Sequence, residues 1–74
     1  MNEKEIAEYT VTMMRKDGVY PNTAVFTGTY SDLRVYKNIS GTHWCVCKDF
    51  EDENGEEKTT IQKFLVSEWF VILN

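Results

Sequence analysis

His43, Cys45 and Cys47 are the residues of this 74-residue chain whose types and spacing come nearest to the chemistry of a site. On an extended strand the three side chains point to one side, and thiolate and imidazole groups are ligands that zinc accepts. A flat strand spaces them too widely, because structural zinc sites use cysteines two residues apart that bend around the ion. The chain also has no further cysteine or histidine as a fourth ligand. We therefore predict no metal, and expect Cys45 and Cys47 to pack as small hydrophobic residues.

The two cysteines do not predict a disulfide or a catalytic thiol either. Two residues apart on a strand, their Cα atoms would lie about 6.6 Å from each other with parallel side chains, which disfavours a disulfide. No glycine-rich turn or helix N-terminus follows either thiol to activate it, and nothing is placed to orient His43. We expect a protein that is not an enzyme, with reduced thiols and no cofactor.

Acidic residues are concentrated in one segment, residues 49–57, which holds six of the twelve and no basic residue. Because the net charge is −4 and this segment carries −6, the rest of the chain is +2. Five of the carboxylates flank the turn sequence Asn54-Gly55: Glu51, Asp52, Glu53, Glu56 and Glu57. An acidic hairpin tip suits binding to a protein with a basic surface, since opposite charges steer association. The alternative is a solvated turn whose charges only maintain solubility.

Aromatic residues make up 14% of the chain, more than so small a core can bury completely. Some Tyr and Trp side chains should therefore lie at the surface, where they often anchor partners, and we select Tyr36 and Trp44 as candidates. A second candidate surface is basic and consists of Arg15, Lys16, Arg34 and Lys37. It would suit a nucleic acid or nucleotide, although the net negative charge disfavours nucleic acid as a partner.

The framework that must position these residues is predicted from the alternation of apolar and polar residues, which favours one mainly β domain over residues 1–74. Strands are expected at residues 9–15, 24–29 and 33–37, on both sides of Asn54-Gly55, and at residues 70–73. Gly28 predicts a kink or bulge. Asn2 to Glu8 is expected to be a short helix or a frayed segment, and Ser67 to begin a single helical turn.

Asn54-Gly55 is typical of a two-residue type I′ hairpin turn. Such a turn places Glu53 opposite Glu56, and like charges in facing positions cost stability. Glu51 then faces Lys58. In this register one face of the hairpin carries Trp44, Val46, Phe50 and Ile61. Lys48 falls on the same face, where a bulge could relieve the misfit.

The run HWCVCKDFEDENGEEKTTIQKFLVSEWFVIL resembles the core of SH3-like barrels. It contains a Trp-bearing strand, a tight hairpin, another strand, a helical turn and a terminal strand. The chain is similar in this respect to small SH3-like proteins of bacteria and phages. The resemblance implies a small five-stranded SH3-like barrel. It does not imply binding of proline-rich peptides, because the chain lacks an Ala-Leu-Tyr-Asp-Tyr-type motif and a proline before Ser67.

These observations predict a core made of residues from every strand: Val11, Met13, Val25, Phe26, Leu33, Val35, Val46, Phe50, Ile61, Leu65, Phe70 and Ile72. The predicted function is non-enzymatic protein binding through the acidic hairpin. A phage-encoded inhibitor of a host defence or nucleic-acid-processing protein would fit it. A self-assembling structural subunit is a further alternative. The acidic N-terminus and the lack of an apolar run of roughly 18 residues predict a cytoplasmic protein with no membrane contact.

Overall fold

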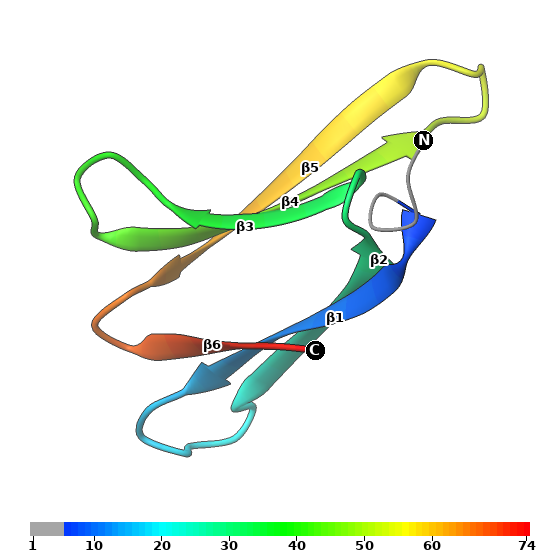
Figure 1. Cartoon of the computed structure of the whole chain (residues 1–74). Coiled ribbons are helices and arrows are strands. Elements are labelled where there is room, and N and C mark those ends of the chain that lie inside the picture. Colours follow the sequence, from blue (N-terminus) through cyan, green and yellow to red (C-terminus); the bar gives the residue numbers. More distant parts are fainter. Residues whose placement is uncertain (1–5) are drawn as a thin grey trace.

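The computed structural model describes residues 6–74, which form six β-strands (Figure 1). The strands are β1 (Glu8–Arg15), β2 (Thr23–Thr29), β3 (Leu33–Lys37), β4 (His43–Glu51), β5 (Glu57–Leu65) and β6 (Trp69–Leu73). They make two antiparallel three-stranded sheets, one in the order β2-β1-β6 and the other in the order β3-β4-β5. The prediction of a mainly β fold is confirmed.

The predicted five-stranded barrel is not confirmed, because the six strands form two separate sheets that do not close. β5 and β6 follow each other in sequence but lie at the margins of different sheets, joined by a turn in which the Glu68 N–H donates to the Leu65 carbonyl. Residues 66–68 therefore form a turn where a helical turn was expected. The expected helical or frayed segment falls mainly on residues 1–5, outside the described residues, and β1 already begins at Glu8.

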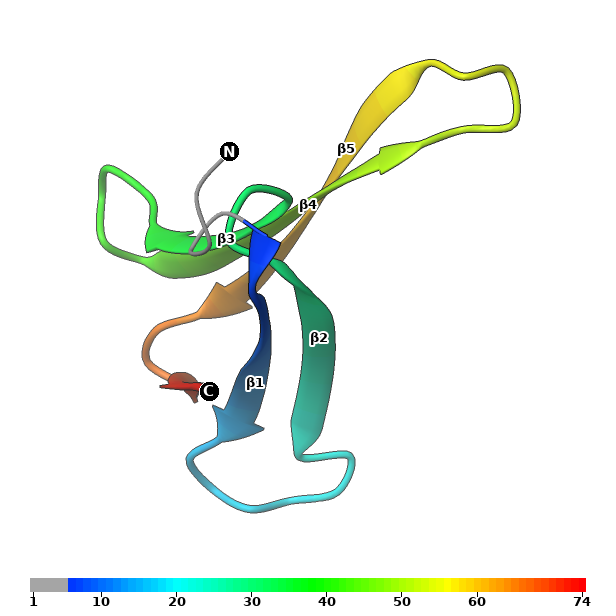
Figure 2. The ribbon, with the colours of Figure 1, turned by 45° about the vertical axis from the view of Figure 1, so that its right-hand side comes forward.

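The core lies between the facing sides of the two sheets, which cross each other (Figure 2). β1 alternates as the sequence predicts, and its inward side chains Tyr9, Val11 and Met13 are buried. Leu33 of β3 and Val46 of β4 meet them from the other sheet. Partly buried apolar residues surround this centre: Ala24, Phe26, Val35, Trp44, Phe64, Trp69 and Val71.

Tyr9 joins the two sheets at the corner where β2 leads into β3. Its hydroxyl donates a hydrogen bond to the carbonyl of Leu33, and its ring stacks on Tyr30 with centroids 4.2 Å apart. Gly28 pairs with Tyr9, and a Cβ at Gly28 would lie 2.5 Å from Asp32 Oδ1 and 2.9 Å from Leu33 Cβ. The glycine therefore permits a close approach at this corner, in a strand whose pairing with β1 continues without a bulge.

Six residues predicted for the core are exposed instead: Val25, Phe50, Ile61, Leu65, Phe70 and Ile72. Val25, Phe70 and Ile72 alternate with the inward residues of β2 and β6, so they point away from the other sheet. Phe50 is the last residue but one of β4, and this end of the strand extends beyond the other sheet (Figure 2). Conversely, Cys45 and Cys47 are buried, as small hydrophobic residues, on the face of their sheet opposite to Val46.

The β4–β5 register differs from the predicted one by a single residue, which changes the face that β5 presents. Ile61 pairs with Cys47, so it lies on the outer face of the sheet and is 55% exposed. Glu51 faces Glu57, and not Lys58 as predicted. Lys48 does lie on the inner face, but no bulge forms. Its Nζ reaches the Thr27 carbonyl of the other sheet at 2.6 Å.

Candidate functional site

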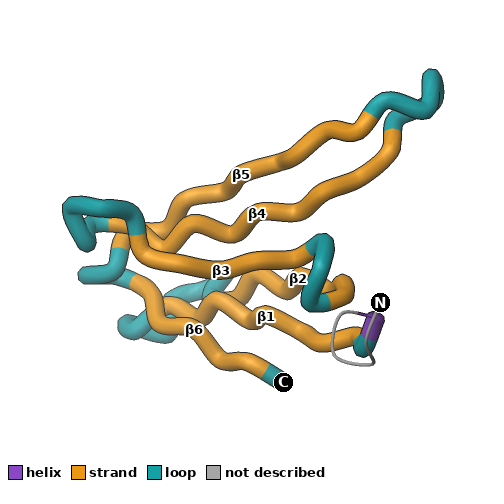
Figure 3. The backbone as a smooth tube through the Cα atoms, turned by 45° about the horizontal axis from the view of Figure 1, so that its top comes forward, coloured by secondary structure: helices purple, strands orange, loops and turns teal. Residues whose placement is uncertain are grey.

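The acidic residues lie at the end of the β4–β5 hairpin, which extends away from the other strands (Figures 1 and 3). Glu51, Glu53, Glu56 and Glu57 are exposed, and Asp52 is half-buried. We call these five residues the acidic tip. All of them come from one continuous segment, so the hairpin alone brings them together.

Asp52 has a structural task within the acidic tip. Its Oδ1 accepts the backbone N–H groups of Asn54 and Glu56, both at 2.9 Å. The Gly55 N–H donates to the Asp52 carbonyl, and Gly55 has a φ of 79°, a conformation that glycine adopts at no steric cost. This is the three-residue hairpin loop, a turn followed by a left-handed glycine, in place of the predicted two-residue turn. The extra loop residue accounts for the changed register.

The carboxylates of the acidic tip divide between the two faces of the hairpin. On one face Lys58 Nζ lies 3.3 Å from Glu56 Oε2 and 4.0 Å from Asp52 Oδ2. On the other face Glu51 lies directly opposite Glu57. Among the described residues, no ion pair is formed by Glu51, Glu53 or Glu57. The predicted facing pair of Glu53 and Glu56 is therefore not formed, and the like charges that face each other are Glu51 and Glu57 instead.

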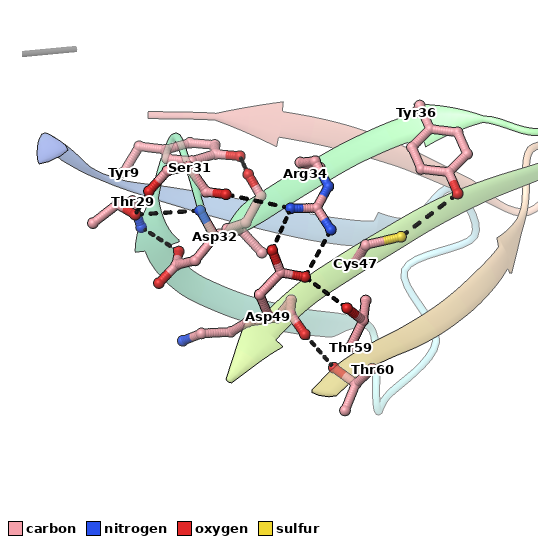
Figure 4. Close-up of polar contacts among 12 residues, drawn as sticks. Tyr9, Thr29, Ser31, Asp32, Arg34, Tyr36, Cys47, Asp49, Thr59 and Thr60 are labelled. Atoms are coloured by element: carbon pink, nitrogen blue, oxygen red, sulfur yellow. Dashed lines mark hydrogen bonds and ion pairs between the residues drawn. The ribbon is translucent and has the colours of Figure 1, made fainter. Parts of the chain in front are cut away.

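Asp49 belongs to the same acidic segment but is neutralised by its neighbours (Figure 4). Arg34 donates two hydrogen bonds to its carboxylate, each at 2.9 Å, and the Thr59 hydroxyl donates a third at 2.7 Å. These bonds, from Arg34 foremost, lower the pKa of Asp49 to about 2. The bond to Asp49 in turn raises the pKa of Arg34. This ion pair fixes the centre of the outer face and removes Asp49 from the charge available to a partner.

The four cations of the basic candidate surface do not form one surface. Arg15 is paired with Asp17 at 2.6 Å, and Arg34 with Asp49. Lys37 lies on the inner side of its sheet, with Nζ 5.1 Å from the centre of the Trp44 ring. Lys16 follows the end of β1. Arg15 and Arg34 are therefore already compensated, whereas Lys37 lies on β3 and Lys16 lies in the turn after β1 of the other sheet.

Tyr36 and Trp44, the two aromatic candidates, lie on opposite faces of one sheet. Tyr36 pairs with Cys45 on the outer face and is 48% exposed. Its hydroxyl accepts a hydrogen bond from the Cys47 thiol at 3.6 Å, which raises the pKa of Tyr36 (Figure 4). Trp44 is half-buried and packs against the core. The structure does not bring either residue to the acidic tip.

The sequence reasoning missed a shallow groove on the outer face, with a volume of about 600 Å³. Its lining combines exposed apolar side chains with a buried thiol and a cation: Tyr36, Asn38, Ile39, Ser40, Cys45, Ile61 and Lys63. Alternation along β4 places Cys45 and Cys47 together, but the contribution of Ile61 depends on the register. The presence of Ile61 in the groove could have been predicted only with the correct length of the hairpin loop.

His43 and the two cysteines share the outer face, as strand parity predicts, without forming a metal centre in the described part of the chain. His43 Nδ1 lies 2.8 Å from Thr42 Oγ1, and Cys47 contacts Tyr36. Residues 6–74 also contain no helix of the length and apolarity needed to cross a membrane. No protein-family model, curated protein or solved structure matches this chain.

Proposed function

We propose that this protein is a non-enzymatic protein-binding module whose contact element is the acidic tip of the β4–β5 hairpin. The partner is a protein with a basic surface, and binding acts by electrostatic attraction and by covering that surface. Such an activity suits a phage-encoded inhibitor of a host defence or nucleic-acid-processing protein, in which the carboxylates replace nucleic-acid phosphates.

The observation that carries this proposal is a set of exposed carboxylates without an ion pair to any described residue, on a hairpin held in shape by Asp52: Glu51, Glu53 and Glu57. Glu51 and Glu57 repel each other across the two strands, which costs stability in the free protein. A basic partner would relieve that repulsion on binding. Projection of the hairpin beyond the other strands allows it to enter a concave surface (Figure 2).

For the architecture, we propose an open variant of an SH3-like barrel. The support is the path of the chain through β2 and β3, which are separated only by the turn at residues 30–32 and belong to different sheets. If they count as one strand bent at this turn, the chain has five strands, the number that the resemblance to SH3-like proteins implies.

The test compares the wild-type chain with the variant Glu51→Lys/Glu53→Lys. Asp52 is kept because it holds the turn, and Glu57 is kept because it lies within β5. Glu8→Lys/Glu68→Lys is the control, since it changes the net charge equally at exposed positions outside the hairpin. Each tagged chain captures proteins from a lysate of the source organism, and captured proteins are quantified by mass spectrometry.

We expect a partner that the wild type and the control retain and that the hairpin variant loses by at least about tenfold. Binding of this partner to the wild type should also weaken as salt is added, because the attraction is between exposed charges. Retention of every partner by the hairpin variant would contradict the proposal, as would a partner lost equally from the control.

A further inference from the structure

β5 has one edge without a strand partner in the described part of the chain. It pairs with β4 on one side only, at the margin of its sheet. The Asp52 N–H donates to the Glu56 carbonyl and the Val66 N–H to the Thr42 carbonyl, which places the even-numbered residues of β5 in hydrogen-bonded pairs with β4. Backbone groups of the odd-numbered residues therefore point to the free edge: Glu57, Thr59, Ile61, Lys63 and Leu65.

Among residues 6–74, this is the longest strand edge without a strand partner, and the side chains of β5 from Glu57 to Lys63 are exposed. β5 has nine residues. β3 and β6 have five residues each, and the free edge of β2 is partly occupied where Lys48 bonds the Thr27 carbonyl. An exposed edge of this kind is a template for strand addition.

The sequence of β5 is complementary to itself when reversed. If Thr60 faces Thr60 of a second copy, Glu57 faces Lys63 at both ends of the paired segment, and Thr59 faces Ile61. Odd-numbered residues then face odd-numbered residues, so the backbone groups that point to the free edge bond to one another. In this register no two like charges are opposite, and the second copy's Lys63 lies directly opposite Glu57.

Neighbouring registers lack this match. A two-fold axis at Ile61 would leave Glu57 opposite Leu65 and Lys63 opposite Thr59, and an axis at Thr59 would leave Lys63 beyond the paired strand. The axis at Thr60 uses residues 57–63, the part of β5 toward the projecting hairpin and away from the sheet that contains β6 (Figures 1 and 3). It also places the two exposed Ile61 side chains as diagonal neighbours on one face.

We propose that two copies of this chain associate through antiparallel pairing of β5 with β5, about a two-fold axis between the two Thr60 residues. The product is one continuous six-stranded sheet in the order β3-β4-β5-β5-β4-β3. This interface goes beyond the proposed function, because the acidic residues Glu51 and Glu53 take no part in it.

The test is a charge swap, read by sedimentation equilibrium over a concentration series at low salt. The chains compared are the wild type, Glu57→Lys, Lys63→Glu and Glu57→Lys/Lys63→Glu. Both changes are at exposed positions, and circular dichroism establishes that each of the three variants is folded. Each single variant places like charges opposite each other twice per dimer, whereas the double variant restores both opposite-charge pairs.

We expect a wild-type dimer, single variants whose dimer dissociation constant is at least about tenfold higher, and recovery in the double variant. A wild-type chain that is still monomeric at about 1 mM would overturn the proposal. So would single variants that dimerise like the wild type, or a double variant no better than the singles. Glu51→Lys/Glu53→Lys should dimerise normally, which separates this result from the outcome for the acidic tip.

Discussion

β1 and β5 are similar in length and are both antiparallel strands, yet they occupy opposite extremes of this structure. β1 lies between β2 and β6, pairs on both sides and buries alternate residues. β5 pairs on one side, and eight of its nine residues are exposed. The comparison separates the two requirements of a small β protein. β1 supplies the apolar contacts that hold the sheets together, whereas β5 is exposed and, among residues 6–74, has one edge without a strand partner.

The sharpest test of this contrast is truncation of one apolar side chain in each strand. Met13→Ala removes a fully buried side chain from β1 and should lower the free energy of unfolding by about 2–5 kcal/mol. Ile61→Ala on β5 removes a side chain that is 55% exposed and should change it by less than about 0.5 kcal/mol. Denaturant unfolding at a concentration that keeps the chain monomeric measures both. Similar losses in the two variants would abolish the distinction between the strands.

A smaller effect is expected from the hydroxyl group that links β1 to the second sheet. Tyr9→Phe leaves the buried Leu33 carbonyl without its donor, which should cost about 1–3 kcal/mol of stability. Tyr36→Phe is the matched control, because that hydroxyl is on an exposed residue and accepts only a weak bond from a thiol. Thermal or denaturant unfolding of both variants provides the comparison. If Tyr36→Phe proved the more damaging change, the corner at Tyr9 would not be the main polar link between the sheets.

The smallest predicted effect concerns acid, through the Asp49 carboxylate that ties β3, β4 and β5 together. Its pKa is about 2 in the folded protein, below the usual value of about 3.9, so its stabilising effect is complete above pH 4 and is lost as the pH falls toward 2. Asp49→Asn should be less stable than the wild type at pH 7, and the difference should shrink between pH 4 and pH 2. Urea unfolding across this range measures it.

The control for that experiment is Glu53→Gln, which removes a carboxylate without an ion pair among the described residues. Its difference from the wild type should vary little over the same interval of pH. A constant difference between Asp49→Asn and the wild type from pH 7 to pH 2 would contradict the depressed pKa.

Sequence patterns predicted the strands well where alternation was strong and turns were marked by glycine or polar residues. Residues 9–15 and 33–37 were expected as strands and occur as β1 and β3 with nearly those limits. The burial of Val11, Met13, Leu33 and Val46 was also expected. These successes have a common basis, because a residue in the middle of an alternating strand keeps its side when the strand limits move by one or two positions.

The errors arose in strands that carry apolar residues on both faces, because alternation alone does not show which of the two faces is buried. Phe70 and Ile72 were chosen for the core, but Trp69 and Val71 face it, and either choice satisfies alternation. Ile61 was misplaced because Asn54-Gly55 fits both a two-residue turn and the loop observed, in which Asp52 binds two backbone N–H groups. One residue more in that loop moves every β5 side chain to the other face.

For the candidate site, the acidic tip was predictable because its residues are contiguous. Its internal division was not, since the structural role of Asp52 and the neutralisation of Asp49 depend on hydrogen bonds with the hairpin loop and with Arg34. The groove beside Tyr36 and the free edge of β5 were not predicted. Both require knowing which strands are neighbours, and pairing partners are set by contacts between segments distant in sequence.

The sequence by itself determined the mainly β fold, the position of the strands and the local charge of the hairpin, because alternation, turn residues and carboxylates act over a few neighbouring residues. Only the tertiary structure decided that the strands form two sheets and that Tyr36 and Trp44 face opposite ways. It also left β5 with one edge that pairs with no other strand of residues 6–74. These features depend on which apolar faces meet, and that choice is made by the packing of the whole chain around Val11, Met13, Leu33 and Val46.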